Sequence, residues 1–128
     1  MIRAILAFSL CFCVCACFSQ DDDLSRRSYL MINSKRQLLG LPALAFRDND
    51  QPNEELRQVM SGVDFQCISP CKDDCQWSVL ITGKSMKEYH RNLTDLKWPY
   101  FQGNKKQITI ASAIDPRNGS YWSVIYVY

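Results

Sequence analysis

Residues 107–128, QITIASAIDPRNGSYWSVIYVY, decide the fold class of this chain. Two segments rich in β-branched and aromatic residues, 107–114 and 121–128, flank the turn residues DPRNGS, and Asn118-Gly119 predicts a β-hairpin. Apolar side chains of the second segment would point to both faces of a sheet: Trp122, Val124, Tyr126 and Tyr128 to one, Tyr121, Ile125 and Val127 to the other. Because a sheet with one wet face shows polar residues on one alternation, both faces here need cover.

Helical periodicity marks three segments that can supply this cover. Residues 21–40 predict a helix that ends at Gly40 before Pro42, with an apolar stripe of Leu24, Met31 and Leu38 flanked by Ile32 and Leu39. Residues 50–62 predict a shorter helix with the apolar residues Leu56, Val59, Met60 and Val63. Residues 85–97 predict a third helix, begun by a Ser85–Glu88 capping box, with a face of Met86, Tyr89, His90 and Leu93.

A further strand is predicted at residues 76–82, QWSVLIT. Together these segments predict an α+β fold, a three-layer α-β-α sandwich in which helices cover both faces of a small antiparallel sheet.

The first 19 residues have the pattern of a secretory signal peptide: Arg3, an apolar run and then small residues. Ser19 at −1 and Cys17 at −3 suit cleavage; lipidation of Cys17, as in a bacterial lipoprotein, is the alternative. No later apolar run is long enough to cross a bilayer, so residues 20–128 are predicted to form a single secreted, extracellular domain with no membrane span.

The charges exclude some partners. The formal net charge is +2 and both signs are interspersed along the chain, which argues against a nucleic-acid partner. No sequence motif indicates a cofactor.

Three cysteines follow the predicted leader in CISPCKDDC: Cys67, Cys71 and Cys75. Export favours a disulfide bond among them, and the odd number leaves one thiol free or bonded to a second chain in a covalent dimer. The C-x3-C-x3-C spacing is wider than that of structural zinc sites. The sequence leaves open which pair is bonded.

The segment INSKRQLLGLPALAF, residues 32–46, resembles the opening of the CAP superfamily (cysteine-rich secretory, antigen 5 and pathogenesis-related proteins). Its pattern residues here are Asn33, Arg36, Gly40, Pro42, Leu44 and Phe46. Residues 82–101 and the hairpin at 108–128 are similar to the family's central helix and closing hairpin. The resemblance implies a CAP-like α-β-α sandwich, in a shortened member.

The family's cleft holds a divalent metal with two histidines and two glutamates, and the resemblance implies that this chain has lost that site. Gln76 and Asp95 stand at the two glutamate positions as degenerate remnants, Asn92 replaces a tryptophan, and both histidines are missing. We therefore expect no metal-binding or catalytic residues and no enzyme activity, but a secreted binding protein that engages an extracellular protein or lipid.

Two alternatives remain open from the sequence. His90 is the only histidine; on a helix it would lie about 140° from Asp95, and its position beside Met86 and Leu93 predicts a partly packed side chain. A small secreted enzyme would pair it with one of the cysteines. An inhibitor or toxin-like protein would act through the cysteine loop.

Two further features bear on the surface. Asn92 and Asn118 each begin an N-glycosylation triplet, and Asn92 is the expected acceptor because Asn118 lies in a tight turn. Six aromatic residues are predicted to pack in the core and hairpin, with a ligand groove as the alternative: Trp77, Trp98, Tyr100, Phe101, Tyr121 and Trp122.

Overall fold

The computed structural model of the chain describes residues 21–68 and 74–128; the predicted leader and Cys71 lie outside these ranges. The elements follow in the order α2 (Asp22–Leu38), β1 (Ala45–Phe46), α3 (Gln51–Met60), η1 (Phe65–Cys67), β2 (Trp77–Gly83), α4 (Met86–Leu93), η2 (Pro99–Phe101), β3 (Gln107–Ile114) and β4 (Tyr121–Val127). Within these ranges no helix has the length and apolarity that a membrane span requires.

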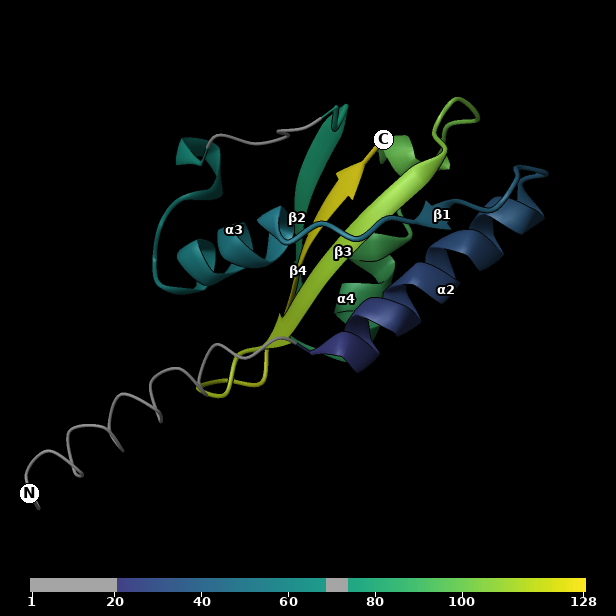
Figure 1. Ribbon diagram of the computed structural model, residues 1–128. Coiled ribbons are helices and arrows are strands. Elements are labelled where there is room, and N and C mark those ends of the chain that lie inside the picture. The colour runs from purple at the N-terminus through teal and green to yellow at the C-terminus, as the bar shows by residue number, and fades with distance from the viewer. Residues whose placement is uncertain (1–20, 69–73) are drawn as a thin grey trace, which may run out of the picture.

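The four strands form one mixed sheet in the order β1-β3-β4-β2 (Figure 1). The predicted hairpin is confirmed: β3 and β4 pair antiparallel from Ile108–Val127 to Ile114–Tyr121, and β2 pairs antiparallel with β4. The prediction of a purely antiparallel sheet was wrong at one edge, where β1 runs parallel to β3. β1 has only two residues, too few to show the alternation by which a strand is found in a sequence.

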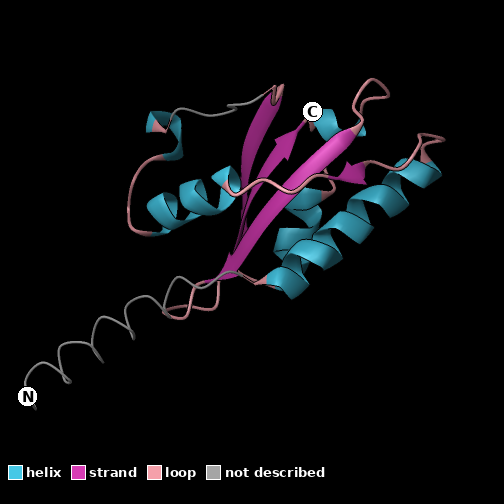
Figure 2. Cartoon of the chain, in the orientation of Figure 1, coloured by secondary structure: helices cyan, strands magenta, loops and turns pink. Residues whose placement is uncertain are grey.

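Helices lie against both faces of this sheet: α2 and α4 pack on one face and α3 on the other (Figures 1 and 2). The side chains of β4 divide between the faces as predicted. Ile125 and Val127 join the core under α2 and α4, and Val124 and Tyr126 join the core under α3. The fold is therefore of the α+β class.

The buried face of α2 differs from the predicted stripe. Its buried residues follow a four-residue repeat, Leu24, Ser28, Ile32 and Arg36, with Ser25 beside them, whereas Leu38 is 85% exposed. The stripe prediction was right for Leu24 and Ile32 but wrong for Leu38 and Leu39, because it counted only apolar residues, while two polar side chains of this helix have buried hydrogen-bond partners. Val63, beyond α3, is likewise exposed.

Helix α4 is shorter than predicted, and only one of the two hydrogen bonds of the predicted capping box is formed. Ser85 Oγ accepts a hydrogen bond from the Glu88 amide at 3.1 Å, but the Glu88 carboxylate accepts from Lys84 N rather than from Ser85 N. Gly83 allows α4 to approach β2 closely, since a Cβ there would lie 2.4 Å from the Tyr89 amide nitrogen. Tyr89, in the first turns of α4, is therefore buried in the core directly against β2.

Candidate functional site

The residues of the N-x-x-R … L pattern form one brace between α2 and the chain that follows it. Asn33 Oδ1 accepts a hydrogen bond from Leu44 N at 2.8 Å, and its Nδ2 donates to Leu44 O at 3.2 Å. Leu44 is 1% exposed, and Gly40 has φ +74°, a left-handed conformation that suits glycine after a helix. The pattern therefore turns the chain back along α2 toward β1.

Arg36 extends this brace to the other half of the molecule. Its side chain is fully buried; Nε donates to Pro42 O at 2.7 Å, and Nη1 donates to Tyr100 O and Gln102 O at 2.8 and 2.9 Å. Burial lowers the pKa of Arg36, but an arginine keeps its proton in proteins. The guanidinium thus ties α2 and the Pro42 loop to Tyr100, which is 64 residues from Arg36 in sequence, so its role is structural.

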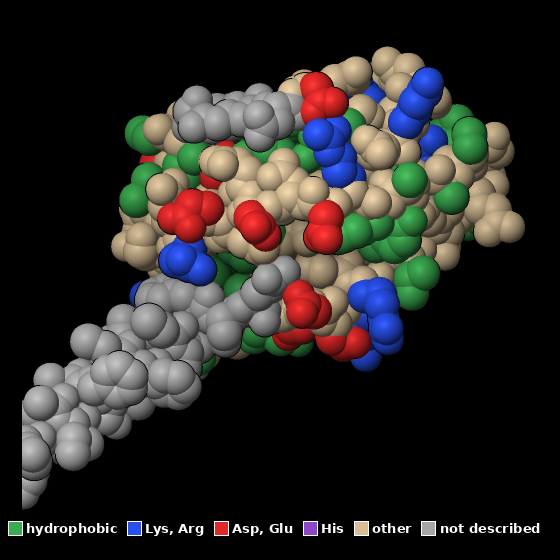
Figure 3. Space-filling model, in the orientation of Figure 1, with side chains coloured by type: hydrophobic (Ala, Val, Ile, Leu, Met, Phe, Trp, Pro, Cys, Tyr) green, Lys and Arg blue, Asp and Glu red, His purple; other side chains and the backbone are tan. Residues whose placement is uncertain are grey.

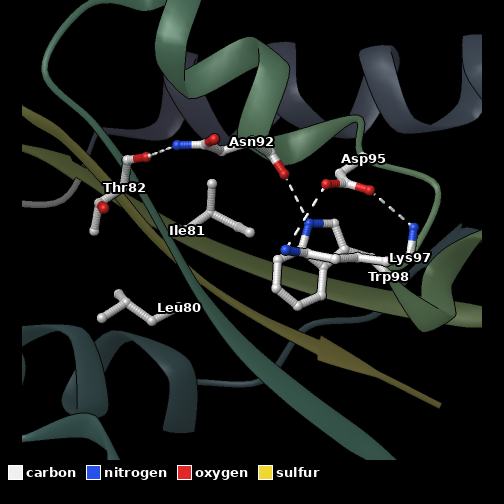
Figure 4. Close-up of a pocket in the computed structure, with 7 residues that line it drawn as sticks. All are labelled: Leu80, Ile81, Thr82, Asn92, Asp95, Lys97 and Trp98. Carbon is white, nitrogen blue, oxygen red and sulfur yellow. Dashed lines mark hydrogen bonds and ion pairs between the residues drawn. The ribbon is translucent and has the colours of Figure 1, made fainter.

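Asp95, one of the two remnants of a cleft that the resemblance predicts, lines a small polar hollow of about 160 Å³ between α4 and β2 (Figure 4). Asn92 lies at its centre: Nδ2 donates to Thr82 O at 2.8 Å, and its backbone oxygen accepts from Trp98 Nε1 at 2.7 Å. Asp95 accepts from Lys97 N at 3.1 Å and forms an ion pair with Lys97 Nζ at 3.8 Å. The polar groups of this hollow are thus engaged in holding the turn after α4.

Gln76, the other remnant, does not meet Asp95. Gln76 is exposed at the start of β2, where its side-chain oxygen accepts a hydrogen bond from Lys105 Nζ at 2.5 Å. It lines a different hollow, together with Asp74 and Tyr128. The two side chains therefore do not share one site in this structure.

Two residues of the enzyme alternative, Cys67 and His90, lie on opposite sides of the sheet. His90 is exposed on α4, so the prediction of a partly packed histidine was wrong. Cys67 is an exposed free thiol in η1, beyond the end of α3. Because α3 and α4 cover opposite faces, the sheet separates this thiol from the imidazole.

The remaining cysteines and the acidic residues form no metal site in the described ranges. Cys75 is disulfide-bonded, and Cys71 lies outside the described residues. No group of three or more histidine, cysteine, aspartate or glutamate side chains within residues 21–68 and 74–128 is placed to hold a metal ion.

An apolar groove lies between the outer surfaces of α2 and α4. Its volume is about 340 Å³, and we call it the helical groove; it is lined by Leu30, Met31, Ser34, Lys35, Leu38, His90 and Thr94. Leu30 and Leu38 are 56% and 85% exposed, although they belong to a helix whose other side is in the core. The sequence showed both leucines, but only the direction of α2 in the fold shows that they face outward.

The structure reverses the ranking of Asn92 and Asn118 as glycan acceptors that the sequence suggested. Asn92 belongs to α4, and its Nδ2, the atom that a glycan would modify, is bonded to Thr82 O. Asn118 is exposed in the β3–β4 loop, where its Oδ1 accepts from Ser120 N at 3.0 Å and leaves the nitrogen outside that bond. The more accessible acceptor is therefore Asn118.

The aromatic set packs mainly with itself, as the core interpretation predicted. Tyr100 and Phe101 are buried with ring centroids 4.8 Å apart, and the half-buried Trp77 and Trp98 have centroids 5.5 Å apart. The Tyr100 hydroxyl donates to Leu93 O, and burial raises the pKa of Tyr100.

Sequence reasoning missed a buried chain of hydroxyl groups. The Tyr89 hydroxyl lies 2.7 Å from Ser28 Oγ and 2.6 Å from Ser123 Oγ, which in turn lies 2.6 Å from Ser112 Oγ. All four residues are fully buried or nearly so, and burial raises the pKa of Tyr89. Serines spaced along a helix and two strands give no periodic signal, so only the fold reveals this network.

Comparison with protein-family models finds none that matches this chain, and comparison with curated proteins finds no similar sequence.

Proposed function

We propose that residues 20–128 are a shortened, CAP-like α-β-α sandwich that is secreted behind a leader of residues 1–19 and acts by binding an extracellular protein. Catalysis and metal binding are not part of the proposed function. The brace of Asn33, Arg36 and Leu44 supports the proposal, since it gives the resembling residues a common structural task. The separation of Gln76 from Asp95 supports a lost cleft.

The observation that carries the proposal is the helical groove. Removing apolar surface from water is favourable by about 25 cal/mol per Å². A partner that covers the helical groove therefore gains binding free energy. Leu38, at 85% exposure, projects from the surface rather than lining a closed cavity, which favours the apolar face of a protein over an enclosed acyl chain. Single exposed leucines are ordinary on proteins, but leucines that share a groove mark interaction surfaces.

The test compares two variants that introduce lysine, one inside the helical groove and one outside it. L30K/L38K places lysines in the helical groove, and V63K places a lysine at an exposed apolar position beyond α3. Each protein is immobilised and exposed to extracellular fluid of the source tissue, and in parallel to phosphatidylcholine vesicles. The proposal expects proteins that the wild type and V63K retain and L30K/L38K loses. Equal retention by all three contradicts it, and retention of vesicles alone makes the partner a lipid.

Three further measurements address the other classes. Titration with Zn²⁺ by calorimetry should show no stoichiometric binding, and one-to-one binding would contradict a lost metal site. The H90A variant should weaken partner binding less than L30K/L38K does, since His90 lines the helical groove but is not one of its exposed leucines. Reduction and alkylation should leave partner binding intact, whereas an inhibitor acting through the cysteine loop would lose it.

A further inference from the structure

A second hollow, of about 390 Å³, lies where α2 passes the β1 edge of the sheet. We call it the edge hollow; it is lined by Asp22, Ser25, Arg26, Tyr29, Phe46, Asp48 and Ile110. Four of these residues form one stripe of α2 at i, i+3, i+4 and i+7. The hollow exists because β1 ends at Phe46, so that no strand covers β3 beyond that point.

The register of the sheet shows which backbone groups face this hollow. Gln107 and Tyr128 exchange hydrogen bonds, with N–O distances of 3.0 and 3.4 Å. In an antiparallel pair such residues alternate with residues whose peptide groups turn to the opposite edge. Ile108, Ile110 and Ser112 therefore direct their N–H and C=O groups away from β4, toward β1 and the hollow.

Two of these three positions are occupied by neighbouring segments. Ile108 O accepts a hydrogen bond from Arg47 N at 2.9 Å, and Ser112 O accepts one from Asp21 N at 2.7 Å. Ile110 lies between them, and no residue of the described ranges hydrogen-bonds to its N–H or C=O on that edge. A parallel ladder would continue from Ile110 N–H to Arg47 O, but Arg47 O accepts from Thr109 Oγ1 instead.

This gap is a hydrogen-bonding position for a ligand. Ile110 is 3% exposed, and buried backbone groups are almost always paired with protein or solvent. Because occupied positions stand on both sides, the gap is one residue wide and cannot accept an added β-strand. Ser25, which is 6% exposed, also has a side-chain oxygen without a partner among the described residues. A small molecule fits the opening, and a peptide strand does not.

Charge and ring geometry define the kind of small molecule. The carboxylates of Asp22 and Asp48 outnumber the single guanidinium of Arg26 in the lining. Figure 3 shows Asp and Glu side chains along the chain between β1 and α3 and near the start of α2, on the face that carries β1. Tyr29 and Phe46 meet edge-to-face with centroids 5.8 Å apart, which provides an aromatic corner.

We propose that the edge hollow binds a small aromatic ammonium ion. The ammonium group donates to the carbonyl oxygen of Ile110 and is attracted by Asp22 and Asp48, while the aromatic ring packs against Tyr29 and Phe46. The site is on the opposite long side of α2 from the partner-binding helical groove, so each can exist without the other.

The probe for this site is phenethylammonium, titrated into the purified protein and followed by calorimetry and amide NMR. Saturable one-to-one binding is expected, with a shift of the Ile110 amide resonance. D48N should weaken binding about three- to fivefold, as expected for one partly exposed ion pair. D50N is the matched control, because Asp50 is an exposed acid two residues away that does not line the hollow. R26Q should strengthen binding by removing a like charge.

Several results would overturn the proposal. These are an absence of saturable binding, equal losses in D48N and D50N, weaker binding by R26Q, or an Ile110 resonance that does not move. Two competitors test the ligand class: the uncharged isostere 2-phenylethanol should bind more weakly than the amine, and so should the zwitterion phenylalanine. Equal binding of the alcohol would show that charge plays no role. Tighter binding of phenylalanine would show that the ligand is an amino acid rather than an amine.

Discussion

Replacing Arg36 by methionine tests whether the brace between α2 and the two loops holds this fold together. Arg36 donates three hydrogen bonds to backbone oxygens, one on Pro42 and one each on Tyr100 and Gln102. Hydrogen bonds that involve a charged group contribute about 1.5–3 kcal/mol each. The gain from no longer burying a guanidinium offsets part of this sum, while each buried carbonyl oxygen that is left without a donor costs about 1–3 kcal/mol.

We therefore expect R36M to lower the free energy of unfolding by about 3–5 kcal/mol, out of the ~5–15 kcal/mol that domains possess. The loss corresponds to a fall in Tm of roughly 10–25 °C for a domain of this size. R36K should lose less, because an ammonium group near Tyr100 O and Gln102 O can still donate to both but cannot reach Pro42 O as well.

The assay is urea unfolding followed by the fluorescence of Trp77 and Trp98, which pack against one another near the brace. R27M is the control: Arg27 is on the same helix, is 63% exposed and forms only a 3.5 Å surface pair with Asp23, so its loss should be below about 0.5 kcal/mol. An R36M protein within about 1 kcal/mol of the wild type, with an unchanged dependence on urea, would refute the structural role of the guanidinium.

Three further predictions follow from the core, the hairpin loop and the free thiol. Y89F should lower the unfolding free energy by ~1–3 kcal/mol in thermal melts, because two buried hydroxyl contacts are lost, whereas Y121F should change it little. Arg117 bonds to Asp115 and lowers the pKa of that carboxyl from 3.8, so its contribution to stability is present above that value and is lost as the pH falls through the folded-state pKa. The stability difference between wild type and D115N should thus be constant from about pH 6 to 8 and shrink below about pH 4, and a constant difference would contradict the assignment. Iodoacetamide without denaturant should modify Cys67, C67A should abolish that modification, and labelling that persists in C67A would show another accessible thiol.

The helices show why apolar periodicity predicts the presence of an element better than its orientation. The periodicity of residues 21–40 predicted the helix, and α2 is there, but its buried side is set by Ser28 and Arg36 as much as by Leu24. Counting apolar residues cannot identify that side, because a polar side chain becomes a core residue only when the fold supplies its hydrogen-bond partners. Glu55 of α3 shows the same limit: this acidic residue is fully buried, and its Oε1 accepts a hydrogen bond from the Tyr126 hydroxyl.

For the candidate site, too, the sequence predicted some residues, and only the fold revealed how they are arranged. Through the resemblance, the sequence singled out Gln76 and Asp95, but it could not show that these two side chains line different hollows. It ranked Asn92 above Asn118 as a glycan acceptor, since a triplet carries no record of what the amide nitrogen bonds to in the fold. The edge hollow has no motif at all, because its central group is the backbone of Ile110.

Local physics determined the elements of this protein from its sequence. Alternation over seven or eight residues produced β3 and β4 at nearly their predicted bounds, and the left-handed Gly40 ended α2. The tertiary structure alone decided which side of α2 is buried, that β1 joins the sheet in parallel, and which polar groups share a hollow. These depend on contacts between residues far apart in the chain, such as Arg36 with Tyr100, and such contacts leave no period in the sequence for a local pattern to reveal.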